Sequence, residues 1–164
     1  MSEINVFVEK CREDIELPTY ANDGDAGMDI RAAIDIEIIP NQTVIIPTGL
    51  KMAIPKGYEI QVRPRSGVSA KTPLRVSNSP GPIDCGYKDE IGVIITNTSE
   101  FSNSFGIYDI SEKLNRHGTY KIKKGDRIAQ IVLKEVPKMR FTVVDDVSNL
   151  GSNRGGGFGS SGVK

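Results

Sequence analysis

Short runs of β-branched and other apolar residues, separated by turn-forming residues, recur along most of the chain. Gly, Pro, Asn and Asp bound these runs, a pattern typical of β-strands. Their spacing of roughly ten residues favours an all-β sandwich or barrel. No long stretch keeps a helical apolar period, so helices should be few, and the best candidate is 111–116. Strands are expected at 4–8, 33–39, 43–49, 50–55, 58–64, 91–97, 119–125 and 127–136.

Composition narrows the class of protein. The chain has 164 residues, 38% hydrophobic and 26% charged, which suits one soluble domain with a core. Basic and acidic residues number 21 each, so a nonspecific nucleic-acid binder is not expected, whereas local arginines can still bind a small anion. No membrane span or signal peptide is evident, so we expect a cytoplasmic protein (host cytoplasm if viral) in which Cys11 and Cys85 are unpaired thiols.

Two segments differ from the strand pattern. We expect one β-barrel domain over 1–150, interrupted by a long polar excursion at 98–119, a length that is usually functional or mobile. Residues 151–164 contain six glycines and cannot form a core of their own. They form either a disordered end or a lid, in which glycine amides approach phosphates and an arginine and an aromatic ring add contacts.

The segment 64–87 carries the most informative chemistry. Asp84 lies between an apolar residue and a glycine-punctuated turn, and follows a Ser-Gly turn at 63–67 that contains two arginines. Amides in such turns suit anions, although a plain turn explains the same residues. An acid in a tight turn near phosphate-binding amides indicates a base that activates water at a phosphorylated ligand.

Four other side chains have both a functional and an ordinary interpretation. Asp29 is either an exposed strand carboxylate or a charge that holds a metal-bound water. Asn78 either reads an amide-like base edge or caps a turn. Tyr87 packs against a sugar or against the core, and Gln130 is an edge residue or a hydrogen-bonded site residue.

Taken together, five ordered motifs resemble the trimeric deoxyuridine triphosphatase (dUTPase) family. Each motif is modestly specific, but five in order over most of the chain are highly specific. The motifs are AGMDIRAA at 26–33, PRSGVSAK at 64–71, NSPGPIDCGY at 78–87, GDRIAQIVL at 125–133 and RGGGFGSSG at 154–162.

The resemblance implies a fold, a reaction and a set of roles. The family hydrolyses dUTP to dUMP and pyrophosphate with Mg²⁺, on a jelly-roll-like (β-clip) barrel. It forms homotrimers in which three subunits build each site, and a flexible Gly-rich C-terminal arm completes it. By resemblance, Asp84 deprotonates the water that attacks the α-phosphorus. Tyr87 packs under the deoxyribose and excludes a 2′-hydroxyl. Asn78 and the hairpin backbone around Gly81 to Asp84, which includes Ile83, read uracil.

The resemblance also assigns the phosphate side of the site. Ser66 and Gly67 contact the phosphates, and Arg65 supports them. Gln130 positions the α-phosphate or the water. Asp29 holds Mg²⁺ through water.

The Gly-rich tail is implied to close over the nucleotide. Arg154, Ser160 and Ser161 are assigned to the γ-phosphate, Phe158 to the uracil face, and Gly159 to substrate binding. The tail has one residue fewer between its arginine and its phenylalanine than the commonest form, a difference that the flexibility of its glycines can absorb.

Two further departures and three rival interpretations stand beside this resemblance. Asp89 replaces a usual glycine; if that position needs positive φ, Asp tolerates it better than most residues. The excursion at 98–119 is longer than in minimal members, and a regulatory protein is a hypothetical partner there. The nearest rival enzyme, dCTP deaminase, needs a glutamate near Ile94, where this chain has none. The two remaining rivals are a nucleotide-switched regulatory module on the same fold and a capsid-like jelly roll.

Overall fold

The computed structural model describes residues 3–101, 106–112, 114–153 and 155–156. Within them almost all regular structure is β-strand, as the sequence predicts. The strands are β1 (Phe7–Lys10), β2 (Met28–Arg31), β3 (Ile36–Ile38), β4 (Thr43–Pro47), β5 (Leu50–Ala53), β6 (Tyr58–Arg63), β7 (Leu74–Val76), β8 (Gly81–Asp84), β9 (Gly92–Asn97), β10 (Gly106–Asp109), β11 (Gly118–Ile122) and β12 (Arg127–Glu135). The helical elements are α1 (Ser66–Lys71) and the 3₁₀ turns η1 (Ile110–Glu112) and η2 (Val147–Asn149).

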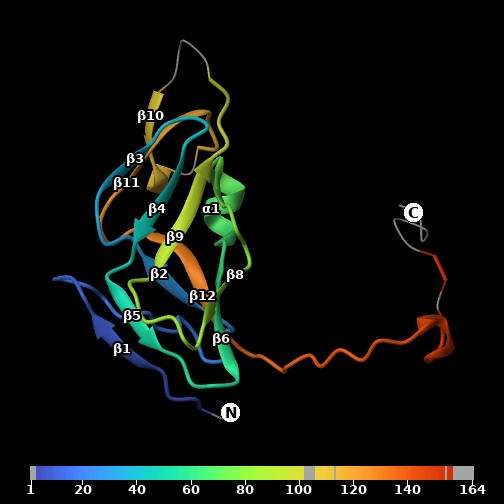
Figure 1. Ribbon diagram of the computed structural model, residues 1–164. Helices are drawn as coiled ribbons and strands as arrows, with labels where there is room; N and C mark the ends of the chain where they lie inside the picture. Colours follow the sequence, from blue (N-terminus) through green and yellow to red (C-terminus); the bar gives the residue numbers. More distant parts are fainter. Residues whose placement is uncertain (1–2, 102–105, 113, 154, 157–164) are drawn as a thin grey trace.

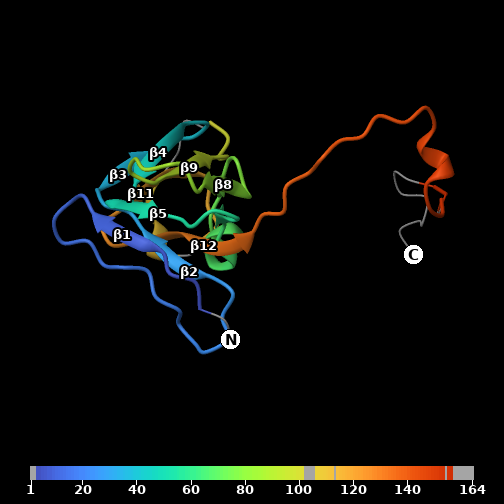
Figure 2. The same cartoon turned by 60° about the horizontal axis from the view of Figure 1, so that its bottom comes forward.

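Four small sheets surround one core (Figures 1 and 2). Their strand orders are β2-β12-β6-β8, β4-β9-β7, β10-β11-β3 and β1-β5. The long β12 pairs with both β2 and β6 and so forms the middle of the four-stranded sheet. Burial alternates along β9, because successive side chains of a strand point to opposite faces. Segments that are distant in sequence, such as β2, β6 and β12, thereby lie side by side in this sheet.

The core is aliphatic, with one buried amide that ties three strands together. Ile30, Ile46 and Ile128 are fully buried. Asn97, also fully buried, donates from Nδ2 to the carbonyls of Ile38 and Gly118, each at 2.8 Å. A buried amide without partners would cost about 1–3 kcal/mol, so these bonds fix β9 against β3 and the start of β11.

Helix α1 corrects the interpretation of the Ser-Gly pair as a turn. Ser66 and Gly67 form the first turn of this helix, which buries Val68. Six residues are too few to display a helical apolar period, which explains why the sequence indicated a turn. The helical turn expected near 111–116 is present as the single 3₁₀ turn η1, which begins one residue earlier, and Asn115 after it has a positive φ of 45°.

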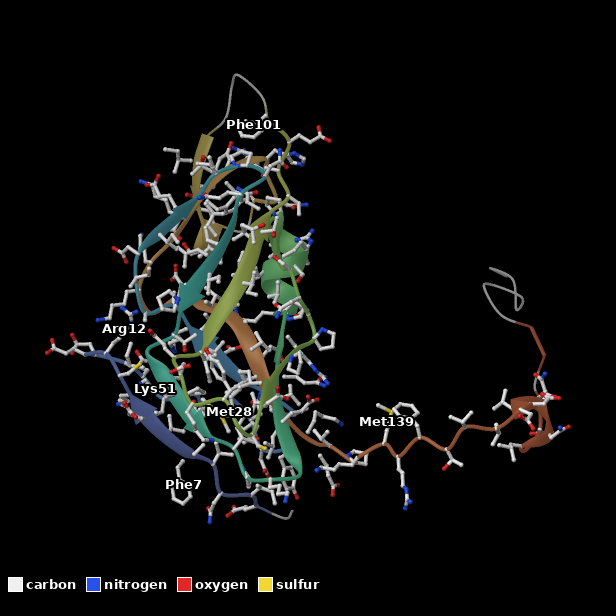
Figure 3. All side chains as sticks on the ribbon, viewed as in Figure 1. Phe7, Arg12, Met28, Lys51, Phe101 and Met139 are labelled. Atoms are coloured by element: carbon white, nitrogen blue, oxygen red, sulfur yellow. The ribbon has the colours of Figure 1, made fainter. Side chains whose placement is uncertain are left out.

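The segment after β12 leaves the barrel. It runs away from the sheets as an extended chain (Figure 1), and Figure 3 labels Met139 on it. Alternate residues Met139, Phe141 and Val143 are 84%, 87% and 96% exposed. Apolar side chains with this period of two are typical of a strand with one face buried, yet none of the described residues covers this face. Within the described ranges, no helix is long and apolar enough to cross a membrane.

Candidate active site

A hollow of about 180 Å³ lies beside β8 and the hairpin that follows it. Five of the residues that the sequence assigned to the site line this hollow, and all five lie within ten consecutive positions of the chain. Those five are Asn78, Gly81, Ile83, Asp84 and Tyr87, and the remaining lining residues are Val62, Pro82, Ile91 and Gly92. A concave site with a few polar groups among apolar walls is typical of small-molecule binding.

Close approach of Asn78 to Gly81 shapes one end of this hollow. A Cβ on Gly81 would lie 2.6 Å from Asn78 Nδ2 and 3.1 Å from its Cγ. A glycine is therefore required for the Asn78 amide to occupy its observed place. That amide carries both a donor and an acceptor, which matches the alternating edge of a pyrimidine such as uracil.

The other end of the hollow is a tight turn that presents an acid and a ring. Asp84 is exposed, and its carbonyl accepts a hydrogen bond from the Tyr87 amide at 3.0 Å. The Tyr87 hydroxyl donates to the Glu90 carbonyl at 3.0 Å. Asp89 has no positive φ, so replacing a glycine there brings no backbone strain.

A second cluster gathers where β2, β12 and the start of α1 meet. Asp29 pairs in register with Gln130, which in turn pairs with Arg63. The Asp29 carboxylate accepts from Arg65 Nε at 2.7 Å and from Arg127 Nη1 at 3.3 Å. Arg127 was not singled out by the sequence, although it belongs to the motif that contains Gln130.

The start of α1 opens beside this cluster. Ser66 and Gly67 are exposed there, and the first amides of a helix have no intrahelical acceptors. A hollow of about 350 Å³ adjoins them and contains three basic side chains and one acidic one. Its lining residues are Arg65, Gly67, Val68, Lys71, Ile110, Ser111, Asp126 and Arg127. This charge balance favours an anion.

The described part of the chain gathers no cluster of metal-ligating side chains. No group of three or more His, Cys, Asp or Glu side chains gathers around a common point in the described ranges. Both oxygens of Asp29 already face arginines. Mg²⁺ in proteins commonly relies on one or two carboxylates together with phosphate oxygens of a ligand, so these residues fit an ion that a phosphorylated ligand would bring with it.

The two hollows are separate within one chain and share no lining residue. In the β6–β8 pair, Gly81 lies opposite Val62 and Asp84 opposite Glu59. Moving along β8 from the amide end to the acid therefore leads away from α1, which follows the other end of β6. The offset from Glu59 to the end of β6 is four residues, or roughly 13 Å. Asp84 and the start of α1 of the same chain are therefore set apart along β6.

Some residues that the sequence assigned to the site lie outside these two hollows, and the structure reveals supporting residues that the sequence did not indicate. Arg154, Phe158, Gly159, Ser160 and Ser161 fall outside the described residues. Arg12 and Glu90 support the hairpin through an ion pair that spans 78 positions of sequence, and no local sequence signal indicated it.

Comparison with known proteins gives a consistent result. A sequence model of the dUTPase family matches residues 13–107. The deoxyuridine 5′-triphosphate nucleotidohydrolase of Chlamydia felis is 40% identical, over 98% of this chain and all of that protein. The Desulfotalea psychrophila enzyme of the same name is 45% identical, over 92% of this chain and 90% of its own.

Solved structures agree with these sequence matches. A variant dUTPase of Staphylococcus bacteriophage 80alpha, solved with dUpNHpp, has a TM-score of 0.86 and 30% identity and covers 97% of this chain and 99% of its own. A variant dUTPase from phage phi11 of S. aureus, described with a coordinated structural Mg(II) ion, has a TM-score of 0.79 and 31% identity and covers 87% of this chain and 98% of its own.

Proposed function

Because the chain belongs to the dUTPase family, we propose that it hydrolyses dUTP to dUMP and pyrophosphate, which lowers dUTP and supplies dUMP for thymidylate synthesis. The observation that carries the proposal is the hollow in which Asn78, Tyr87 and Asp84 meet. It offers an amide for the base, a ring for the sugar and a carboxylate for the reacting phosphate, in the order in which these groups follow one another in a nucleotide.

Asp84 is the proposed general base. It takes a proton from the water that attacks the α-phosphorus, and the bond between the α- and β-phosphates breaks to release pyrophosphate. Its exposed position at the end of β8 leaves room for a water and a phosphate. A positioned base contributes about 10²–10⁴-fold to such a step. Neutralisation and positioning of the phosphates supply most of the remaining acceleration.

Specificity is assigned to the walls of the same hollow. The Asn78 amide pairs with the uracil edge, together with the main chain around Gly81 and Ile83. The contact between Asn78 and Gly81 leaves little space, so the methyl group of thymine is excluded sterically. The Tyr87 ring packs under deoxyribose and leaves a 2′-hydroxyl without a hydrogen-bond partner, which is penalised.

The phosphates are proposed to bind at α1 of a second copy, within a homotrimer that shares its sites. Ser66 and Gly67 contact them, Arg65 supplies charge, and Gln130 positions the α-phosphate or the water. The register of β6 and β8 supports this arrangement, because Asp84 lies opposite the start of β6 whereas α1 follows the end of β6. So does the apolar face of the segment after β12, because Met139, Phe141 and Val143 are left exposed by the described part of the chain.

Mg²⁺ is proposed to arrive with the substrate as the magnesium complex of dUTP. Such an ion would supply positive charge that offsets the phosphates and favours pyrophosphate as the leaving group. Asp29 orients Arg65 and Arg127 toward the phosphates, and its own contribution to the ion passes through water.

The barrel domain at 1–150 is proposed to be completed by residues 151–164 as a lid. Arg154, Ser160 and Ser161 close on the γ-phosphate, Gly159 approaches the nucleotide, and Phe158 covers the uracil.

The direct test is pyrophosphate release from dUTP, dCTP, dTTP and UTP in parallel, with and without Mg²⁺. We expect efficient cleavage of dUTP alone, at full rate only with the metal ion. Asp84→Asn should lower the rate by about 10²–10⁴-fold while nucleotide binding persists. Asp89→Asn removes an exposed carboxylate from the same hairpin and should leave the rate unchanged. Ammonia release from dCTP without cleavage of dUTP would contradict the proposal and favour a deaminase.

A regulatory role for the excursion at 98–119 is a second proposal. The excursion contacts the phosphate-side helix, because the Asn115 amide donates to the Lys71 carbonyl at 2.8 Å. It also exposes Phe101 and Ile107, which are 68% and 58% accessible. One similar phage structure is described as visualising a species-specific insert. A pull-down with and without nucleotide, comparing the intact chain with one shortened at 100–116, tests the role, and identical partner profiles would discard it.

A further inference from the structure

The ion pair between Arg12 and Glu90 lies outside the hollow beside β8 and supports the hairpin that contains Tyr87. Arg12 Nε donates to Glu90 Oε1 at 2.6 Å, and Arg12 Nη2 donates to Glu90 Oε2 at 2.9 Å. The Gly49 amide also donates to Glu90 Oε1 at 2.8 Å. Two parallel bonds from one guanidinium fix both the distance and the plane of a carboxylate, which a single contact does not.

The arginine is itself held in place by the main chain. The amide of the preceding residue, Cys11, donates to the Gly49 carbonyl at 2.9 Å. Gly49 therefore binds the N-terminal segment through its carbonyl and the Glu90 carboxylate through its amide. The three segments around Arg12, Gly49 and Glu90 form one connected unit, and Figure 3 labels Arg12 beyond the end of β1.

The main chain of Glu90 connects this ion pair to the hollow beside β8, because Glu90 is hydrogen-bonded to Tyr87, which lines that hollow. The Glu90 carbonyl accepts the Tyr87 hydroxyl at 3.0 Å. The Tyr87 side chain is 43% exposed, so packing leaves much of its ring unrestrained. The hydroxyl bond therefore sets where the ring lies. The neighbouring Ile91 is buried and lines the hollow, so the far side of Glu90 is fixed as well.

We propose that Arg12 and Glu90 act as positioning residues for Tyr87, and that their ion pair sets how strongly the enzyme discriminates deoxyribose from ribose. The inference rests on the proposed function, because Tyr87 must pack against the sugar of a nucleotide. Discrimination against one oxygen atom depends on ring placement to within about 1 Å or less, whereas binding of the remaining nucleotide depends on it weakly.

The test compares kcat/KM for dUTP with kcat/KM for UTP in wild type and in Arg12→Met, which keeps an unbranched stem but removes the fork. We expect the dUTP-to-UTP ratio to fall by about 10-fold, mainly through a rise for UTP, with kcat for dUTP changed by less than about 3-fold. Lys121→Met is the matched control, since it removes a 3.0 Å ion pair with Glu37 on another sheet and should leave the ratio unchanged.

A double-mutant comparison separates positioning from general stability. Tyr87→Phe removes the hydroxyl bond and retains the ring, so it should lower the ratio by a similar factor. In that background Arg12→Met should have little further effect, because both changes interrupt the same connection. Arg12→Lys keeps the positive charge but loses the two parallel donors of the guanidinium, so it is expected to lower the dUTP-to-UTP ratio by a smaller factor. If Arg12→Met does not fold, Arg12→Lys provides the same test.

The outcomes are distinguishable. A wild type that does not cleave dUTP refutes the proposed function itself. A wild type that discriminates, with an Arg12→Met ratio equal to wild type, overturns the inference alone. A uniform loss of kcat/KM for both substrates also overturns it, because it indicates a role confined to folding.

Discussion

Adding one methyl group at Gly81 should damage uracil recognition without unfolding the protein. In Gly81→Ala the new Cβ would meet Asn78 Nδ2 at 2.6 Å and Asn78 Cγ at 3.1 Å. Ordinary contacts between carbon atoms lie near 3.5–4.0 Å, so the Asn78 amide must retreat by about 1 Å. The flexible side chain can move, and therefore the strain is relieved at the expense of the base contact rather than of the fold.

The magnitude follows from the hydrogen bonds that the displaced amide no longer makes. A buried polar group of the base left without its partner costs about 1–3 kcal/mol. The value of kcat/KM for dUTP should fall by roughly 10–100-fold. The free energy of unfolding should change little, because Gly→Ala also removes about 0.4–1 kcal/mol of backbone entropy from the unfolded chain.

Gly86→Ala is the matched control for this experiment. Gly86 lies in the same hairpin, and a Cβ there would meet no atom within 4 Å. Steady-state pyrophosphate release and thermal unfolding should be measured on both variants. Loss of activity in Gly81→Ala with normal activity in Gly86→Ala is the expected result. Wild-type kcat/KM in Gly81→Ala would refute the assignment of Asn78 to the base.

Three further predictions concern stability and assembly. Gly49 has a φ of +72°, and a Cβ added there would lie 2.5 Å from Ile15 Cδ1. Gly49→Ala should therefore lower the free energy of unfolding in urea by about 2–4 kcal/mol, and an unchanged urea midpoint would contradict this. The pKa of Asp109 is lowered from 3.8 to about 2, chiefly by a hydrogen bond from Lys123. Asp109→Asn should therefore cost about 1 kcal/mol at pH 6, and the difference from wild type should shrink as pH falls from about 4 towards 2; a deficit constant with pH would exclude the carboxylate as its cause. A chain ending at Glu135 should remain monomeric and inactive in size-exclusion and activity measurements, whereas an active oligomer would remove the role of the C-terminal segment.

The strands were predictable because their signal is local. The alternation of residues 91–97 became β9, with every second side chain buried. The pairing of these strands was not predictable, because registers such as Gly81 with Val62 depend on the whole topology. Helix α1 was missed for a different reason: its Ser-Gly start has the same composition as a turn. The two are distinguished by backbone bonds such as the one from the Ser69 amide to the Arg65 carbonyl, which composition does not reveal.

The candidate site was predictable where its residues are neighbours in sequence. The motif from Asn78 to Tyr87 forms one hollow because it consists of strand β8 and the turns on either side of it. The environment of Asp29 was not predictable, because an exposed strand carboxylate and one bound by two arginines have the same sequence pattern. Likewise Arg12 carries no local signal, since its partner Glu90 lies 78 positions away.

A mixing experiment tests whether Asp84 of one chain acts on phosphates held by α1 of another. Asp84→Asn and Ser66→Glu should each be inactive, the second because an exposed carboxylate at the start of α1 repels the triphosphate. After the two variants are unfolded and refolded together in equal amounts, about one quarter of wild-type pyrophosphate release should return, because random assembly joins an intact Asp84 to an intact Ser66 in that share of sites. If the mixture stays as inactive as its components, while wild type treated in the same way recovers, the site lies within a single chain and the shared-site proposal is wrong.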